Sequence, residues 1–117
     1  MKYFILLLFI ATFTSCYYDK EELLYGTIPC DTVNVKYSVQ IINTLQASCY
    51  TCHGGSAASG GGVQLGDYVS LKKVADNGSL LNAITRSVNT MPKGGAKLPD
   101  CKIAEIRAWI QKGAPNN

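Results

Sequence analysis

Two cysteines and a histidine lie close together near the middle of the chain, in the run Cys49-Tyr50-Thr51-Cys52-His53. This C-x-x-C-H spacing is the attachment pattern of c-type haem. Two thiols separated by two residues at the end of a helix can both reach the vinyl groups on one edge of a porphyrin, where they form thioethers. The adjacent His53 is then placed under the iron. The motif therefore predicts one covalently bound haem c with His53 as its proximal iron ligand.

The C-x-x-C pair alone permits three other interpretations. Cys49 and Cys52 would form half of a four-sulfur zinc site if Cys30 and Cys101 supplied the other half. A thioredoxin-like redox pair would need a surrounding βαβ pattern, which the sequence lacks. A structural disulfide within the motif is unusual at such close spacing. The adjoining His53, the helix that leads into the motif and the export signal described below favour haem.

The sixth iron ligand follows from elimination. His53 is the only histidine, so two histidines cannot hold the iron within one chain. Of the two methionines, Met1 leaves with the signal peptide and Met91 lies 38 residues after His53. Pro92 prevents a helix from continuing through this position, and the surrounding loop suits a sulfur presented to iron. The alternative is that Met91 fills a gap in the core.

The first residues of the chain are expected to be an export signal. Lys2 precedes an apolar run from Tyr3 to Phe13, which is too short for a membrane helix of about 20 residues. Phe13, Thr14 and Ser15 before Cys16 resemble a bacterial lipobox. We therefore expect a signal peptide at 1–15, lipidation of Cys16 and a tether at 16–29.

The lipid chains would anchor the protein in the cell envelope, on the periplasmic face or the outer-membrane surface. Tyr17 after the lipidated cysteine leans towards the outer membrane, because it is not the aspartate associated with inner-membrane retention. A simple secretory signal without lipidation of Cys16 is the alternative.

Residues 30–117 are expected to form one small domain. Charged residues make up 16% of the chain and apolar residues 47%, as in an ordinary globular protein. The formal net charge of +3 excludes a dedicated nucleic-acid binder, which would carry dense basic clusters.

Apolar periodicity predicts four helices and almost no strand. A helix from Ser38 to Cys49 would carry Val39, Ile42 and Leu45 on one face and deliver the motif at its end. Asp67 caps a second helix, which Asn77-Gly78 stops and which carries Val69, Leu71 and Val74. Ser79 caps a third with Leu80, Ala83, Ile84 and Val88, and the last runs from Asp100 to Lys112 with Ile103, Ile106, Trp109 and Ile110.

Neither lipid nor haem accounts for Cys30 and Cys101. In an oxidising compartment two such cysteines usually pair. Their disulfide would close a loop of 72 residues and stabilise the fold by about 4 kcal/mol in the chain-entropy model. Two unpaired thiols are the alternative.

The chain from about Ser38 to Ala114 resembles a small class I cytochrome c domain, of the lipoprotein type common in Bacteroidetes. The resemblance implies an all-α fold of about four short helices, in which the first and last helices cross around one covalently bound haem. The residues that carry it are the Cys49–His53 motif, the Met91-Pro92 loop and the terminal helix with Ile106, Trp109 and Ile110.

One departure from the family concerns the histidine. The family often has a proline soon after the motif, whose carbonyl accepts a hydrogen bond from Nδ1 of the ligand histidine. Residues 54–62 contain no proline, so the partner of His53 is unassigned.

Together these features predict a membrane-anchored monohaem c-type cytochrome that carries electrons and is not an enzyme. Its partners would be redox proteins, an oxidase or a reductase, and Lys72, Lys73, Lys93 and Lys97 are expected to flank the Met91 side and attract an acidic one. The alternatives are a haem sensor or a peroxidase-like enzyme in which Met91 is displaceable, and a zinc-stabilised binding module.

Overall fold

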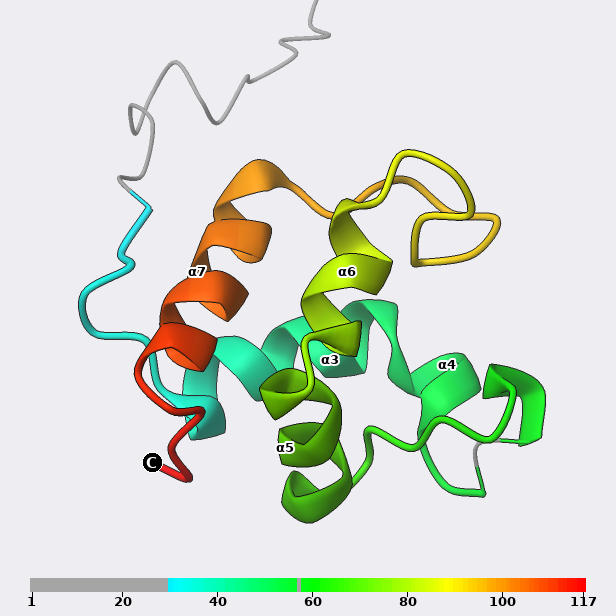
Figure 1. The fold of residues 1–117 in the computed structure, drawn as a ribbon, viewed down its shortest axis with the longest axis horizontal. Helices are drawn as coiled ribbons and strands as arrows, with labels where there is room; N and C mark the ends of the chain where they lie inside the picture. The colour runs from blue at the N-terminus through cyan, green and yellow to red at the C-terminus, as the bar shows by residue number, and fades with distance from the viewer. Residues whose placement is uncertain (1–29, 57) are drawn as a thin grey trace, which may run out of the picture.

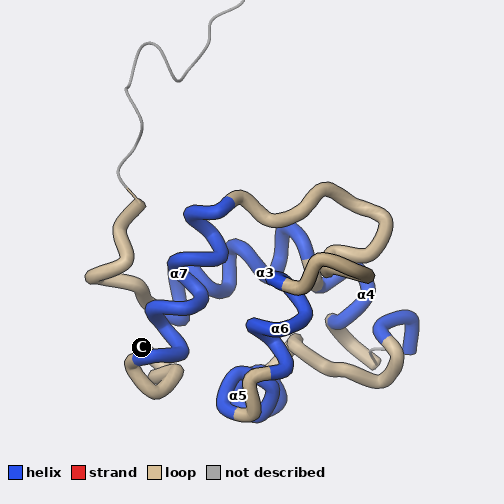
Figure 2. The backbone as a smooth tube through the Cα atoms, turned by 45° about the horizontal axis from the view of Figure 1, so that its top comes forward, coloured by secondary structure: helices blue, strands red, loops and turns tan. Residues whose placement is uncertain are grey.

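The computed structural model describes residues 30–56 and 58–117. The predicted signal peptide, the predicted lipidation site Cys16 and the predicted tether lie outside the described residues. Within these residues the protein consists of helices and loops with no strand, which confirms the all-α prediction (Figure 2). No helix in the described part of the chain is long and apolar enough to cross a bilayer.

The first helical segment, predicted as one helix from Ser38 to Cys49, is divided into three parts. It begins with the π-helical turn η2, Tyr37–Ile41, continues as α3, Ile42–Ser48, and resumes after Cys49 as α4, Tyr50–His53. Its buried side chains, Tyr37, Ile41, Thr44 and Leu45, follow α-helical spacing, and Val39 lies on the opposite side of the segment. Ile41 and Leu45 are buried at 1% exposure, whereas Val39 is 47% exposed.

Helix α5, Tyr68–Asp76, begins and ends as predicted. The side chain of Asp67 accepts a hydrogen bond from the backbone N–H of Ser70 at 2.9 Å, which makes Asp67 the N-cap. Asn77 is the C-cap, and Gly78 follows with a φ of +80°, a left-handed conformation that glycine adopts without strain. Leu71 is fully buried, but Val69 is 76% exposed, so its placement on the buried face is wrong.

Helix α6, Ser79–Thr85, buries Leu80 and Ile84 as predicted. Two details of that prediction are wrong. Ser79 is the first helical residue and Gly78 occupies the N-cap, because the Asn77 side chain accepts from the Ser79 N–H and closes the turn first. Val88 lies beyond the end of the helix and is 71% exposed.

Helix α7, Asp100–Gln111, is followed by the C-cap Lys112 and by Gly113, which has a φ of +85°. Its buried face carries Ile103, Ile106 and Trp109. This face packs against η2 and α6, and α7 runs across the first helical segment (Figure 1).

An aromatic cluster lies where α7, η2 and α5 meet. The ring of Tyr37 lies 5.1 Å from that of Tyr68, edge to face, and 6.0 Å from that of Trp109, nearly parallel. Trp109 is fully buried, and its indole N–H donates to the carbonyl of Pro115 at 2.9 Å. The Tyr68 hydroxyl donates to the carbonyl of Ala114 at 2.8 Å. The aromatic side chains therefore hold the segment after α7 against the core.

That segment also satisfies the start of the first helical segment. The N–H of Tyr37 donates to the side-chain oxygen of Asn117, and the N–H of Ser38 donates to its backbone oxygen, both at 2.8 Å. The first N–H groups of a helix have no partner within the helix. Asn117 therefore caps the first helical segment. We call the three rings together with residues 113–117 the aromatic end.

The sulfurs of Cys30 and Cys101 lie 2.11 Å apart and form a disulfide, with the Cα atoms 5.5 Å apart. The pairing is the one predicted from the two remaining cysteines. It attaches the start of the described chain to the first turn of α7.

Candidate functional site

The cysteine motif lies at the end of the molecule away from residues 113–117 (Figure 1). Cys49 interrupts the helix between α3 and α4, with φ −125° and ψ −37°. The N–H of His53 donates to the Cys49 carbonyl at 2.9 Å, so these two residues stand one turn apart. Cys49 is half-buried and Cys52 is exposed, and the two sulfurs are not bonded to each other. Burial raises the pKa of the Cys49 thiol and keeps it protonated.

The imidazole of His53 is oriented by the backbone of a later loop. Its Nδ1 lies 2.8 Å from the carbonyl oxygen of Val63, and the carbonyl of His53 accepts from the N–H of Leu65 at 2.8 Å. With the proton on Nδ1, the ring donates to Val63 and leaves Nε2 as the free nitrogen for a metal. Val63 is thus the acceptor that the missing proline leaves unassigned.

Gly60 lies directly against this ring, at the end of the short 3₁₀ turn η3, Ala58–Gly60. A Cβ added at Gly60 would stand 2.4 Å from Nδ1 of His53 and 2.6 Å from the carbonyl oxygen of Cys52. No side chain fits there, so glycine is required for the loop to reach the imidazole. The sequence marks this stretch as glycine-rich but does not single out position 60.

Two adjoining cavities open beside the motif, with volumes of about 290 Å³ and 520 Å³. Both are in the range of sites that bind small molecules and cofactors. The smaller one is lined mainly by apolar side chains. The lining of the larger one includes the exposed residues Cys52 and Lys93. Four residues line both cavities: Cys49, His53, Gly60 and Met91.

Met91 lines the cavities from the loop between α6 and α7. Its N–H donates to the carbonyl of Ala83 in α6 at 2.9 Å, which attaches the loop to a buried helix. Arg86, which lines the smaller cavity, donates through Nε to the carbonyl of Asn89 at 2.8 Å and stabilises the loop from within. The structure therefore brings Met91 together with the motif, although 38 residues separate it from His53.

The four lysines do not form the expected surface. Lys72 pairs with Asp76 at 2.9 Å and also donates to the carbonyl of Gly113, which places it at the aromatic end. Lys97 pairs with Asp100 at 3.3 Å. Lys73 is exposed, and of the four only Lys93 lines a cavity beside the motif.

The donor set fits haem better than zinc. A zinc site completed by Cys30 and Cys101 is wrong, because these two sulfurs are bonded to each other. Cys49 and Cys52 are unpaired thiols; Cys49, His53 and Met91 line both cavities, and Cys52 lines the larger one. Haem attachment uses all four groups.

The chain matches no protein-family model, no curated protein and no solved structure. The functional argument therefore rests on the residues and their geometry.

Proposed function

We propose that this protein is a monohaem c-type cytochrome of class I that carries electrons at the cell envelope, anchored through a lipid on Cys16. One observation carries the proposal. Cys49, His53 and Met91 line the same pair of cavities, although Met91 comes from a distant loop. Two thiols, an imidazole and a thioether beside two adjoining cavities are the groups that a covalently bound haem with His and Met ligands would need.

Each side chain has a separate task in this proposal. Cys49 and Cys52 hold the cofactor through thioether bonds, and His53 presents Nε2 while its Nδ1–H donates to the Val63 carbonyl. Met91 presents its sulfur from the opposite loop. The haem supplies an iron that alternates between the ferrous and ferric states. Apolar residues of α6 and of the loop after the motif exclude water: Val63, Leu65, Leu80, Ala83 and Ile84.

The ligand pair favours electron transfer over catalysis. A methionine sulfur stabilises ferrous iron, so His53 with Met91 raises the reduction potential relative to two nitrogen ligands. If His53 and Met91 both held the iron, oxygen and peroxide would find no vacant position to bind. The packing of α7 across η2 also supports the family resemblance, because the first and last helices cross in class I cytochromes c.

The decisive experiment uses the full chain, produced with a haem-maturation system. We expect a c-type reduced-minus-oxidised spectrum and a weak near-infrared sulfur-to-iron band in the oxidised protein. Met91→Ala should keep the covalent haem but bind carbon monoxide readily in the ferrous form, and Met91→His should lower the potential.

Two results would overturn the proposal. Colourless protein that loses a metal to a chelator would indicate the zinc-stabilised module. If the wild-type ferrous protein binds carbon monoxide as fast as Met91→Ala, the sixth site is open and the protein is a sensor or a peroxidase-like enzyme.

A further inference from the structure

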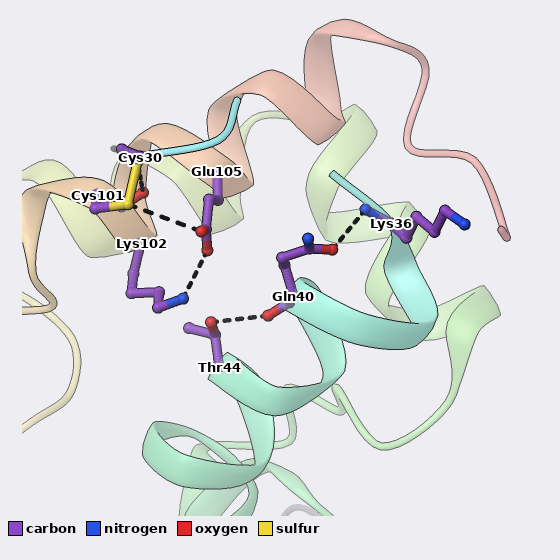
Figure 3. A network of polar contacts seen from close by, with 7 residues as sticks. All are labelled: Cys30, Lys36, Gln40, Thr44, Cys101, Lys102 and Glu105. Atoms are coloured by element: carbon purple, nitrogen blue, oxygen red, sulfur yellow. Dashed lines mark hydrogen bonds and ion pairs between the residues drawn. A yellow bond between two sulfur atoms is a disulfide. The ribbon is translucent and has the colours of Figure 1, made fainter. Parts of the chain in front are cut away.

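The disulfide lies beside a buried carboxylate. Cys30 is exposed, whereas Cys101, in the first turn of α7, is half-buried. Glu105 follows Cys101 by one helical turn, so both side chains lie on the same side of α7 (Figure 3). Glu105 is only 7% exposed, which is rare for a carboxylate unless its oxygens have partners.

Among the residues that the structure describes, one oxygen of Glu105 has an ordinary hydrogen-bond donor and the other does not. Oε2 accepts from the ammonium of Lys102 at 2.9 Å. Oε1 faces Sγ of Cys101 at 3.7 Å (Figure 3). That sulfur is bonded to Cys30 and carries no hydrogen, so it cannot donate to the carboxylate. A buried oxygen without a donor is costly.

The geometry points to a thiol–disulfide exchange site at Cys30–Cys101, in which Glu105 Oε1 accepts the hydrogen that Cys101 carries only after reduction. In the oxidised protein the Cys101 sulfur has no hydrogen to donate to Glu105. In the reduced protein the Cys101 thiol donates one, and the same contact becomes a hydrogen bond. Glu105 therefore stabilises the reduced form relative to the oxidised form, and the substrate class is a dithiol reductant, a small molecule or a redox protein.

The exchange proceeds in two balanced steps. A thiolate of the reductant attacks Sγ of Cys30, the sulfur–sulfur bond to Cys101 breaks, and a mixed disulfide forms on Cys30. Cys101 leaves as a thiolate, takes a proton from solvent and donates it in a hydrogen bond to Glu105. The second thiol of the reductant, as its thiolate, then attacks the mixed disulfide and releases Cys30. The reductant is oxidised to a disulfide and the protein gains two electrons and two protons.

Exposure and charge select Cys30 as the sulfur attacked. Cys30 lies at the surface, whereas Cys101 lies against α7 with Glu105 beside it. A thiolate leaving from Cys101 forms at the N-terminus of a helix of 12 residues, which stabilises it until it takes a proton and bonds to the Glu105 carboxylate.

Reduction would free Cys30 without unfolding the domain. The following segment has its own attachments: Lys112 donates to the Val33 carbonyl, and Val35 is buried at 2% exposure. Asp31 accepts from the N–H groups of Val33 and Asn34 at 2.8 Å and 3.0 Å. The change is confined to the start of the described chain, next to the predicted tether.

The test measures the midpoint of this disulfide in the full chain as produced. The protein is equilibrated in graded mixtures of reduced and oxidised dithiothreitol, free thiols are trapped, and peptide mapping counts Cys30 and Cys101 separately from the motif cysteines. Glu105→Gln should shift the equilibrium about tenfold towards the disulfide, a lowering of the midpoint by about 30 mV. A role in folding alone would lower the stability of both forms and leave the midpoint unchanged.

Asp100→Asn is the matched control. It makes the same carboxylate-to-amide change in the first turn of α7, at a side chain that is 95% exposed. We expect its midpoint to move less than twofold. An equal shift in both variants, or none in Glu105→Gln, overturns the role of Glu105.

A second measurement needs no variant at Glu105. When the wild-type folded protein reacts with glutathione and is quenched with acid, the mixed disulfide should map to Cys30. A mixed disulfide on Cys101, or a disulfide that reacts only after the protein unfolds, overturns the exchange site.

Discussion

The two ends of the molecule differ in what completes them. At the aromatic end, Tyr37, Tyr68 and Trp109 pack against one another, and the segment after α7 supplies partners for their polar atoms. At the motif end, Cys52 is exposed and the loops around His53 and Met91 enclose cavities. The chain completes one end with its own side chains, whereas the other end leaves cavities in which the proposed haem would lie.

The largest effect is expected from the motif cysteines. Cys49→Ala or Cys52→Ala should abolish stable holoprotein, because the proposed porphyrin would form much of the core at the motif end and a domain of this size has little apolar surface to spare. A haem-stained denaturing gel and thermal unfolding measure the loss.

The control removes the other cysteine pair. With both Cys30→Ser and Cys101→Ser, covalent haem should be retained while the melting temperature falls. A well-folded, stable apo-domain from either motif variant would show that the motif end needs no haem, and the contrast between the two ends would disappear.

The next largest effect concerns the aromatic end. Trp109→Ala should lower the free energy of unfolding by about 3–5 kcal/mol, because the indole is fully buried and fills the space between α7 and η2. Chemical denaturation of the haem-loaded protein measures this. The haem spectrum of the folded fraction should be unchanged, and a spectral shift would mean that the two ends are coupled.

A smaller effect is expected at Gly60. Gly60→Ala places a Cβ 2.4 Å from Nδ1 of His53, so the ring or the loop must move, at about 1–3 kcal/mol in the free energy of unfolding. The reduction potential should shift, because the bond from His53 to Val63 tunes the ligand.

Gly66→Ala is the matched substitution, because its new Cβ would meet its nearest atom, the Gly55 nitrogen, at 3.5 Å, an ordinary contact. It should change stability by less than about 0.5 kcal/mol. If both variants behave alike, close packing at position 60 does not orient His53.

The smallest effect is expected at Asp67, the N-cap of α5. A hydrogen bond from the Ser70 N–H holds the pKa of this carboxyl below its ordinary value of 3.8. The ionised cap therefore stabilises α5 fully above pH 3.8, and the contribution is lost as the pH falls through the lowered pKa. Asp67→Ala should lower the melting temperature by a few degrees at neutral pH.

The difference between wild type and Asp67→Ala should shrink below pH 3.8. Melting curves across the acid range measure it. A difference that stays constant into acid would assign the effect to backbone propensity and not to the charged cap.

Sequence reasoning succeeds where a local signal decides the structure. Asp67 and Asn77 mark the two ends of α5, and the spacing of the buried residues along α7 matches the prediction. It fails at Val39, because an apolar residue type alone does not show that this position lies opposite the buried Tyr37 and Ile41. It also misses Asn117 as the cap of the first helical segment, because Asn117 lies 80 positions from Tyr37 and 79 positions from Ser38 in the sequence.

The candidate site divides in the same way. Cys49, Cys52 and His53 follow from one short motif, and Met91 follows from elimination. The hydrogen-bond partner of His53 cannot be predicted in this way. It is the backbone carbonyl of Val63, and every residue type has such a carbonyl. Gly60 is hidden among several glycines, and only the distance to the imidazole distinguishes it.

The contact between His53 and Val63 has a consequence for mutational tolerance. The acceptor is a main-chain oxygen, and the Val63 side chain is 43% exposed, so another apolar side chain at position 63 keeps both the oxygen and the apolar wall of the cavity. A saturation scan would score position 63 as permissive to apolar residues and position 60 as intolerant. Val63, whose carbonyl bonds to His53, would thus be scored as tolerant of substitution. The constraint on this loop would be seen at Gly60 instead.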